Sequence, residues 1–377
     1  MKKIFLIILL LFPISVLGVE KDLIPNAPSG ILMEYSTGKI LYEKNAYEKM
    51  APASMTKIMT MLLIMEALED GKINLNDMIY VSSNASSMGG SQVYLEPNTK
   101  IKAEELLKSI AVASANDSAV AMAEAIAGTT DAFVSKMNEK AKSLGCLNTN
   151  FANVHGLDDS NHYTTAYDMA LMAKELLKYD DILKYSSIYE AYLQKPDGSS
   201  TWMVNTNKLI KYYNGLDGLK TGYTSSAGYC LTSTAKRNDM RLITVLMKEP
   251  TSQIRNSETI DLLNYGFSNY KIKTILKKDH NLGFIEVLNG KKDQVNLKLL
   301  EDATNLEGIN DNLEYTYNIK VSPIKAPVKV GDKVGFLEVK LNNQNIRKYP
   351  ITVSENIPQA NLWDLYKRNM LKVLIGN

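Results

Sequence analysis

The sequence predicts an α+β fold: an antiparallel sheet flanked by helices with an inserted all-helical lobe, followed by a small all-β domain and a C-terminal amphipathic helix. Two β-type runs precede a helical block, and three more β-type runs and a helix follow it, so the sheet draws on both ends of the first domain. Beyond about residue 270 the pattern changes to short β-type runs punctuated by Pro, Gly and Asn. A length of 377 residues suits one large core and a smaller unit.

The first eighteen residues have the pattern of a secretory signal peptide. Lys2 and Lys3 precede an unbroken apolar run over residues 4–12, and residues 16–18 offer small or apolar side chains for cleavage. The alternative is a membrane-spanning anchor. That run is shorter than the ~20 residues a spanning helix needs, and Pro13 interrupts it. We therefore expect residues 1–18 to direct export.

The first domain is predicted to begin with a hairpin over 30–35 and 39–43. Residues 54–68 are apolar on nearly every face and end before Gly71, which predicts a helix buried at the centre of the domain. Further helices are expected over 103–112, 117–127 and 165–177. The period then changes to strands over 218–223, 228–235 and 241–247, and a helix over 251–265 closes the domain.

The small β-domain is predicted from five short runs, none of which carries a group that looks catalytic. They cover residues 283–288, 294–299, 314–321, 334–341 and 349–353.

Residues 359–377 form an amphipathic pattern with Trp363 and Tyr366 on the apolar face. The opposite face carries Asp364, Lys367, Arg368 and Lys372. This combination is typical of a helix that lies in a membrane interface, and the alternative is a helix docked on its own domain or on a partner. The basic excess beside two aromatic residues favours the membrane surface.

Charge and cysteine content exclude several classes of protein. Without Lys2 and Lys3 the chain has 41 basic and 41 acidic residues, so nothing suggests binding to nucleic acid. Cys146 and Cys230 are the only cysteines, and two buried thiols are as well supported as one disulfide, because a chain this long can fold without a bridge. Three histidines and two cysteines without zinc spacing lead us to expect no metal and no cofactor.

Three short motifs follow one another along the chain, and their order is informative: Ser54-Met55-Thr56-Lys57, Ser114-Ala115-Asn116 and Lys220-Thr221-Gly222. Ser-x-x-Lys occurs five times and Ser-x-Asn three times, so each alone is weak, but Lys-Thr-Gly occurs once. Only Ser54 has a helical context with both other motifs downstream. The set predicts a serine acyl-transfer site.

The chemistry explains why these residue types occur together. A serine hydroxyl needs a base, and Lys57 would share the helical face of Ser54. Lys57 can act as that base if burial and a second cation, Lys220, lower its pKa. The backbone N–H groups of Ser54 and Tyr223 would bind the oxyanion.

The remaining motif residues are assigned to the substrate. Ser114 would pass a proton to the leaving amine, and Asn116 would hold a substrate amide. Lys220 and Thr221 would receive a substrate carboxylate, and Gly222 would leave room for the substrate along the strand. The competing structural interpretation, in which these are only cap, loop and strand-end residues, becomes weak when all three motifs occur together.

On these motifs the sequence resembles the low-molecular-mass penicillin-binding proteins, specifically the serine D-alanyl-D-alanine carboxypeptidases of peptidase family S11, from about Pro25 to the C-terminus. Further matching stretches are 155–158, 165–170, 227–229 and 330–332. The resemblance implies a β-lactamase/transpeptidase-like catalytic domain over 25–268, a β-sandwich-like domain over 271–356 and a membrane-association helix over 359–377.

The resemblance also implies an activity at the outer face of the cytoplasmic membrane. Ser54 would form an acyl-enzyme with peptidoglycan stem peptides and release the terminal D-Ala, and β-lactams would acylate the same serine. Arg255 would help to bind the substrate carboxylate, although a surface helix residue is the competing interpretation. His155 would shape the lobe. Tyr223 stands where many members have His, which could alter deacylation or carboxylate recognition.

Three alternatives remain. A class A β-lactamase would need Asp in place of Ala115 and a Glu-x-x-Leu-Asn run, which is absent between Asn116 and Lys220. An endopeptidase or transpeptidase on the same scaffold is harder to separate, because cleft shape selects the acceptor. A non-catalytic wall-binding protein is disfavoured by the complete motif set.

Overall fold

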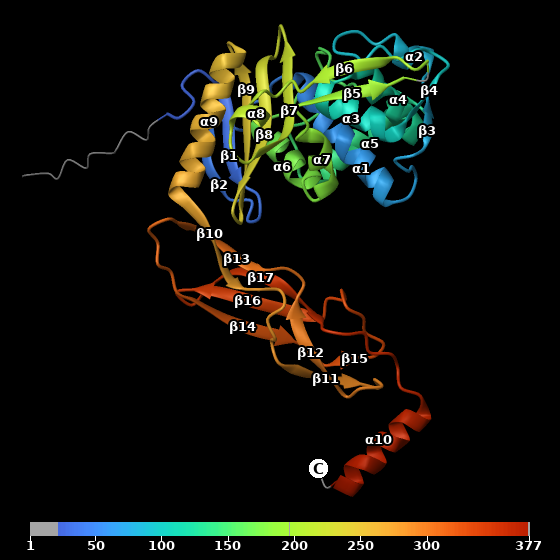
Figure 1. Cartoon of the computed structure of the whole chain (residues 1–377). Coiled ribbons are helices and arrows are strands. Elements are labelled where there is room, and N and C mark those ends of the chain that lie inside the picture. The colour runs from blue at the N-terminus through green and yellow to red at the C-terminus, as the bar shows by residue number, and fades with distance from the viewer. Residues whose placement is uncertain (1–21, 196, 376–377) are drawn as a thin grey trace, which may run out of the picture.

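The computed structural model describes residues 22–195 and 197–375 (Figure 1). A large mixed domain is followed by a small β-domain, and the helix α10, Leu362–Ile375, lies beyond it at the end of the chain (Figure 1). The predicted signal peptide, residues 1–18, lies outside the described residues. The predicted α+β fold is confirmed.

The large domain is built on a five-stranded antiparallel sheet with the order β2-β1-β9-β8-β7. Its strands are β1 Ser29–Glu34, β2 Ile40–Lys44, β7 Leu216–Thr224, β8 Gly228–Arg237 and β9 Met240–Glu249. All five strands were expected from the sequence. β7 is an edge strand, so one side of it is free to meet the lobe or a ligand.

Both faces of the sheet are buried because alternate side chains meet different helices. Leu32 and Leu242 pack in one apolar cluster with Leu262 of α9, Ser252–Asn269. Ile31 and Ile243 pack in the other cluster with α1, Lys57–Glu69, and α6, Ala166–Leu176. Figure 1 shows α9 on one side of the sheet and the lobe on the other.

The lobe is mainly helical, and its remaining helical segments are η1 Ala53–Thr56, α2 Ser83–Ser86, α3 Ala103–Ala113, α4 Asn116–Ala127, α5 Thr130–Ser143, η2 Asp180–Ile182, α7 Leu183–Ser186 and α8 Leu209–Tyr212. Two small sheets that the sequence analysis did not anticipate accompany them. These are β3 Met78–Tyr80 with β4 Lys100–Lys102, and β5 Glu190–Gln194 with β6 Ser200–Val204. The helix α5 was also not anticipated.

The small domain contains a six-stranded sheet with the order β14-β16-β17-β12-β11-β15 and the pair β10–β13. The five expected runs form β11 Phe284–Leu288, β12 Gln294–Leu299, β14 Tyr315–Val321, β16 Gly335–Leu341 and β17 Gln344–Val353. Three strands were missed: β10 Tyr270–Leu276, β13 Ala303–Gly308 and β15 Ile324–Lys325.

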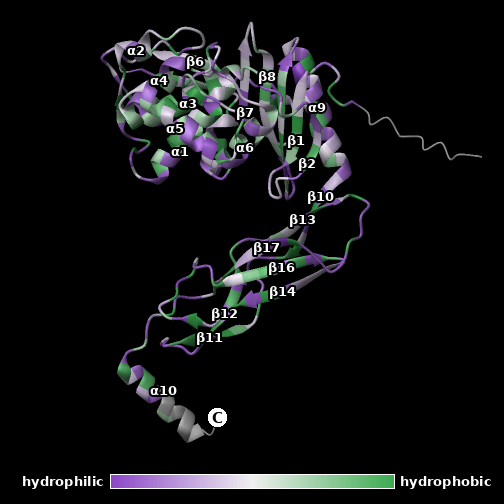
Figure 2. Ribbon diagram, turned by 180° about the vertical axis from the view of Figure 1, so that it is seen from behind, coloured by the Kyte–Doolittle hydropathy of each residue, from purple (hydrophilic) through white to green (hydrophobic). Residues whose placement is uncertain are grey.

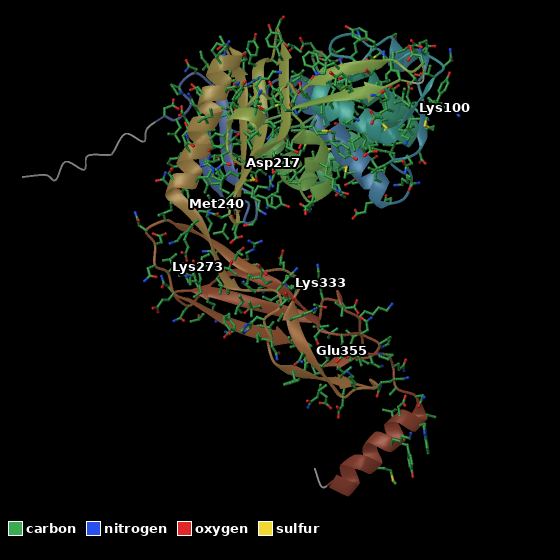
Figure 3. The ribbon with its side chains drawn as sticks, viewed as in Figure 1. Lys100, Asp217, Met240, Lys273, Lys333 and Glu355 are labelled. Atoms are coloured by element: carbon green, nitrogen blue, oxygen red, sulfur yellow. The ribbon has the colours of Figure 1, made fainter. Side chains whose placement is uncertain are left out.

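The two domains meet where α9 passes directly into β10. Figure 3 labels Met240, at the start of β9, and Lys273, on β10, on the two sides of this junction. Arg347 of β17 donates a hydrogen bond from Nη2 to the carbonyl oxygen of Ser36, 3.0 Å away in the first hairpin.

Cys146 and Cys230 are both buried and free, so the two-thiol alternative holds. Hydrophobic and hydrophilic residues both occur on α10 (Figure 2), where Trp363 stacks on Tyr366 with ring centroids 5.6 Å apart. Within residues 22–195 and 197–375, no helix has the length and apolar character to cross a membrane.

Candidate active site

Ser54 lies in the short 3-10 turn η1, and Lys57 is the first residue of α1. The sequence predicted a single helix from residue 54. A 3-10 turn has three residues per turn, so side chains three apart are eclipsed. This local geometry places Lys57 Nζ 3.1 Å from Ser54 Oγ.

Lys57 is fully buried and is held by two carbonyl oxygens. Its Nζ donates to Asn116 Oδ1 at 2.6 Å and to the backbone carbonyl of His155 at 2.8 Å. Burial, and secondly the positive charge of Lys220, hold the pKa of Lys57 well below its usual range. In its neutral form this amine can donate both hydrogens to the two carbonyl oxygens and turn its lone pair toward the Ser54 hydroxyl. Lys57 is therefore arranged as a base for Ser54.

Ser114 and Asn116 occupy the break between α3 and α4. Ser114 has a left-handed backbone, φ +63°, and its buried Oγ has no hydrogen-bond partner among the described residues. Asn116 Nδ2 donates to the carbonyl of Gly89 at 2.6 Å. Both ends of the Asn116 amide thus contact the protein, so this side chain positions Lys57, and its expected contact with a substrate stays a prediction.

Asp117 is a site residue that the sequence analysis missed. Its buried carboxylate accepts hydrogen bonds from the backbone N–H groups of Val93, at 3.0 Å, and Leu95, at 3.1 Å. It also accepts one from the N–H of Ser118, at 2.8 Å. These bonds fix the 89–95 segment against α4 and so support Asn116. The signal available in the sequence was an acid in the first turn of a helix.

Lys220 and Thr221 lie on the edge strand β7. Lys220 is buried, and burial followed by the charge of Arg255 lowers its pKa to about 7. Its Nζ donates to the carbonyl of Thr221 at 3.0 Å, and Thr221 Oγ1 donates to Thr206 Oγ1 at 2.7 Å. The predicted electrostatic influence of Lys220 on Lys57 is present.

Gly222 of β7 lies against the turn that carries Ser54. A Cβ atom at this position would lie 2.7 Å from the carbonyl oxygen of Pro52 and 3.1 Å from Ala53 Cβ. The missing side chain thus leaves room for the turn that carries Ser54, and the role expected for Gly222 in substrate binding stays a prediction. Gly156, another residue missed in the sequence, meets the same turn, since its Cβ would collide with the carbonyl of Ala53.

Arg255 and Tyr223 complete a cavity of about 380 Å³ beside Ser54. Arg255 is only 5% exposed, so the surface-residue interpretation is wrong; its Nη2 donates to Asn256 Oδ1 at 2.8 Å. Tyr223 is 55% exposed, and its ring packs against that of Tyr229 at an interplanar angle of 33°, with centroids 4.4 Å apart. The other residues lining the cavity are Ser91, Ser114, Thr206, Lys208, Thr221, Gly222, Tyr229, Ser252 and Asn256.

The two histidines near the Ser54 motif, His155 and His162, hold neighbouring residues in place. His155 contributes its backbone carbonyl to Lys57, and burial lowers its pKa to about 4. His162 accepts at Nδ1 from the N–H of Ala152, 3.1 Å away, which leaves the proton on Nε2 to donate to Thr56 Oγ1 at 2.7 Å. Thr56 in turn donates to the carbonyl of Ala53 at 2.7 Å, so this chain of bonds fixes the η1 turn.

Comparison with known proteins agrees with this geometry. The Peptidase S11 family, described as D-alanyl-D-alanine carboxypeptidase, matches residues 19–251, and the C-terminal domain of penicillin-binding protein 5 matches residues 270–359. The D-alanyl-D-alanine carboxypeptidase DacF of Bacillus subtilis is 44% identical over 93% of this chain and 90% of that protein.

Two solved structures are similar as well. Penicillin binding protein 5 from Haemophilus influenzae has 31% identity and a TM-score of 0.72, with 91% of this chain and 100% of that chain covered. Penicillin-binding protein D2 from Listeria monocytogenes, in its ampicillin-bound form, has 28% identity and a TM-score of 0.59, with 66% of this chain and 100% of that chain covered. This chain belongs to the Peptidase S11 family of D-alanyl-D-alanine carboxypeptidases.

Proposed function

We propose that this protein removes the terminal D-Ala from peptidoglycan stem peptides through an acyl-enzyme on Ser54. The observation that carries the proposal is the buried Lys57, which is bonded to two carbonyl oxygens and lies 3.1 Å from Ser54 Oγ. Ser54 Oγ attacks the carbonyl carbon of the penultimate D-Ala while its proton passes to Lys57. The N–H groups of Ser54 and Tyr223 receive the oxyanion.

Collapse of the tetrahedral intermediate breaks the C–N bond and releases D-Ala. The leaving amine needs a proton, and Ser114 supports this transfer because its buried hydroxyl has no partner among the described residues and borders the cavity. Water then attacks the acyl ester and restores Ser54. Thr221 and Arg255 receive the terminal carboxylate, supported by their position on the wall of the same cavity.

β-Lactams acylate Ser54 in the same way, since they present a reactive carbonyl beside a carboxylate. The ampicillin-bound form of the similar Listeria protein supports this step. Among the described residues that line the cavity, none is acidic, so no carboxylate there would activate water as in a class A β-lactamase. We expect a long-lived penicilloyl adduct, and rapid repeated benzylpenicillin turnover would contradict it.

Measuring free D-alanine from diacetyl-Lys-D-Ala-D-Ala tests the activity. Ser54→Ala should abolish release and penicillin labelling. Ser36→Ala provides the matched control, because Ser36 also starts a Ser-x-x-Lys run but lies in the first hairpin. If the wild-type protein is labelled by penicillin yet releases no D-alanine, the carboxypeptidase proposal is wrong.

The finer location follows from the two ends of the chain. Residues 1–18 would direct export, and α10 would hold the enzyme on the outer face of the cytoplasmic membrane, with the exposed Trp363 and Tyr366 supporting interfacial binding. The near-neutral mature charge supports a protein that binds no nucleic acid. Deleting residues 359–377 should move the protein from the membrane fraction to the soluble fraction. Retention of the truncated protein in the membrane fraction would refute this anchor.

A further inference from the structure

We propose that Lys208 is a specificity-determining residue whose ammonium group, together with Arg255, draws the C-terminal carboxylate of the peptide into the cavity. The inference rests on the proposed function and adds a residue to it. None of the three motifs contains Lys208. It would favour carboxypeptidase over endopeptidase cleavage, because a peptide that continues beyond the scissile bond, or ends in an amide, lacks the charge at this position.

Lys208 stands on a rigid part of the cavity wall. It borders the same cavity as Ser54 and Arg255, immediately before α8. The preceding residue, Asn207, is buried and donates from Nδ2 to the carbonyl of Gly218 on β7, 3.3 Å away. Thr206 Oγ1 accepts a hydrogen bond from Thr221 Oγ1 at 2.7 Å. The backbone of Lys208 is thus fixed relative to the strand that receives the substrate.

Buried asparagines hold the other side of this segment. Asn205 Nδ2 donates to the carbonyls of Ser186, at 3.1 Å, and Ile188, at 2.9 Å. The N–H of Asn207 donates to Asn205 Oδ1 at 2.8 Å. Such a network is costly to break, because it would leave buried polar groups without partners. The backbone that carries Lys208 is therefore preorganised for binding.

The charges around the cavity favour a carboxylate as the ligand. Lys208 and Arg255 are the cations among the described residues of its wall, and no acidic residue is among them. Among the described residues, no carboxylate lies within 4.0 Å of Lys208 Nζ, which lies 5.5 Å from the centroid of the Tyr189 ring. Its donors therefore remain available for an incoming anion.

Lys208 is better placed than the buried cations Lys220 and Arg255 to attract a peptide carboxylate from solvent. Lys220 already donates to the Thr221 carbonyl, and Arg255 to Asn256. Lys208 is exposed, so its field extends into the solvent from which the peptide arrives. It would attract the carboxylate at the mouth of the cavity, before Thr221 and Arg255 bind it.

The experiment compares diacetyl-Lys-D-Ala-D-Ala with its C-terminal amide, using the full chain and the variants Lys208→Met and Lys208→Glu. The ratio of kcat/KM for acid over amide should fall about fivefold in Lys208→Met, the upper range for an exposed charge pair, and further in Lys208→Glu. The loss should appear in KM. Raising the ionic strength should reduce the wild-type preference for the acid.

Lys211 provides the matched control. Its Nζ also lies over the Tyr189 ring, at 4.9 Å, but Lys211 does not border the cavity. Lys211→Met and Lys211→Glu make the same charge changes and should keep the wild-type acid-to-amide ratio. An unchanged ratio in both Lys208 variants, or equal losses on acid and amide, would overturn the inference. Failure of the wild-type protein to release D-alanine would instead overturn the proposed function.

Discussion

The buried carboxyl group of Glu249 provides a direct test of how burial raises a pKa. Glu249 is the last residue of β9, is only 1% exposed, and its carboxyl group can share a hydrogen bond with the carboxyl group of Glu258. Its acidic neighbour Glu258, on α9, accepts hydrogen bonds from Asn26 and Ala27. Burial, and secondly Glu258, raise the pKa of Glu249 to about 8, against smaller opposing effects of Lys44 and Arg255.

The sign and size of the effect follow from proton linkage. At pH 7 Glu249 is protonated in the folded protein, whereas in the unfolded chain, with a pKa of 4.5, it is ionised. The folded state binds more protons, so stability falls as the pH rises from about 4.5 to about 8. Each pH unit costs about 1.4 kcal/mol, which gives about 3 kcal/mol at pH 7.

Glu249→Gln keeps the shape of the side chain and removes its ionisation. The variant should match the wild-type free energy of unfolding near pH 4.5 and exceed it by about 3 kcal/mol at pH 7. Urea unfolding between pH 5.5 and pH 8.5, followed by the fluorescence of Trp202 in the large domain, measures this difference. Parallel pH profiles for the variant and the wild-type protein would refute the reasoning.

Glu338 provides a control of opposite sign. Its carboxylate is bonded to Lys320 at 2.9 Å and to Lys348 at 3.1 Å, which hold its pKa below the usual 4.5. Its stabilising contribution is present above pH 4.5 and is lost as the pH falls through the folded-state pKa. Glu338→Gln should therefore lower stability at neutral pH, with the loss disappearing in acid.

Three further predictions concern the catalytic centre. Gly222→Ala should slow acylation by a fluorescent penicillin at least about tenfold, because the new Cβ would displace the turn at Pro52, 2.7 Å from its oxygen; a wild-type rate would show that the turn yields freely. Lys220→Gln should raise the pKa of Lys57 and move the pH profile of acylation to higher pH, and an unmoved profile would contradict the role of that charge. Asp117→Asn should lower the free energy of unfolding by about 1–3 kcal/mol, since an amide cannot accept all three N–H bonds, and unchanged stability in urea would refute this.

The parts of the fold that could be predicted are those with a strong local period. The helices α1, α3, α4 and α6 and the strands β1 and β9 each bury a set of apolar residues, whereas β2 buries only Leu41 and α9 buries Leu262 and Leu263 beside polar residues. The helix α5 was not predicted because its sequence is mostly polar and only Phe133, Met137 and Ala141 are buried. The strand β5 was also not predicted, and only Leu193 in it is buried.

The candidate site also contains residues that could be predicted from the sequence and residues that could not. The motif residues could be selected because their order is rare, and Ser54, Ser114 and Thr221 now border one cavity with Lys57 directly behind Ser54. The supporting residues could not be selected. Gly156 matters because of Ala53, and His162 because of Thr56, which are contacts between segments about a hundred residues apart. A single sequence carries no signal for such pairs.

The burial of Lys57 and Lys220 is best explained by chemistry and not by stability. Both side chains are fully buried, and no described carboxylate lies within 4.0 Å of either ammonium group. Their pKa values are lowered, so folding releases protons from groups that the unfolded chain would keep charged, and this costs free energy at neutral pH. An apolar side chain of similar length would avoid that cost. In the proposed mechanism Lys57 instead supplies Ser54 with an amine whose pKa is lowered, partly by the charge of Lys220, and an apolar core could not supply such a base.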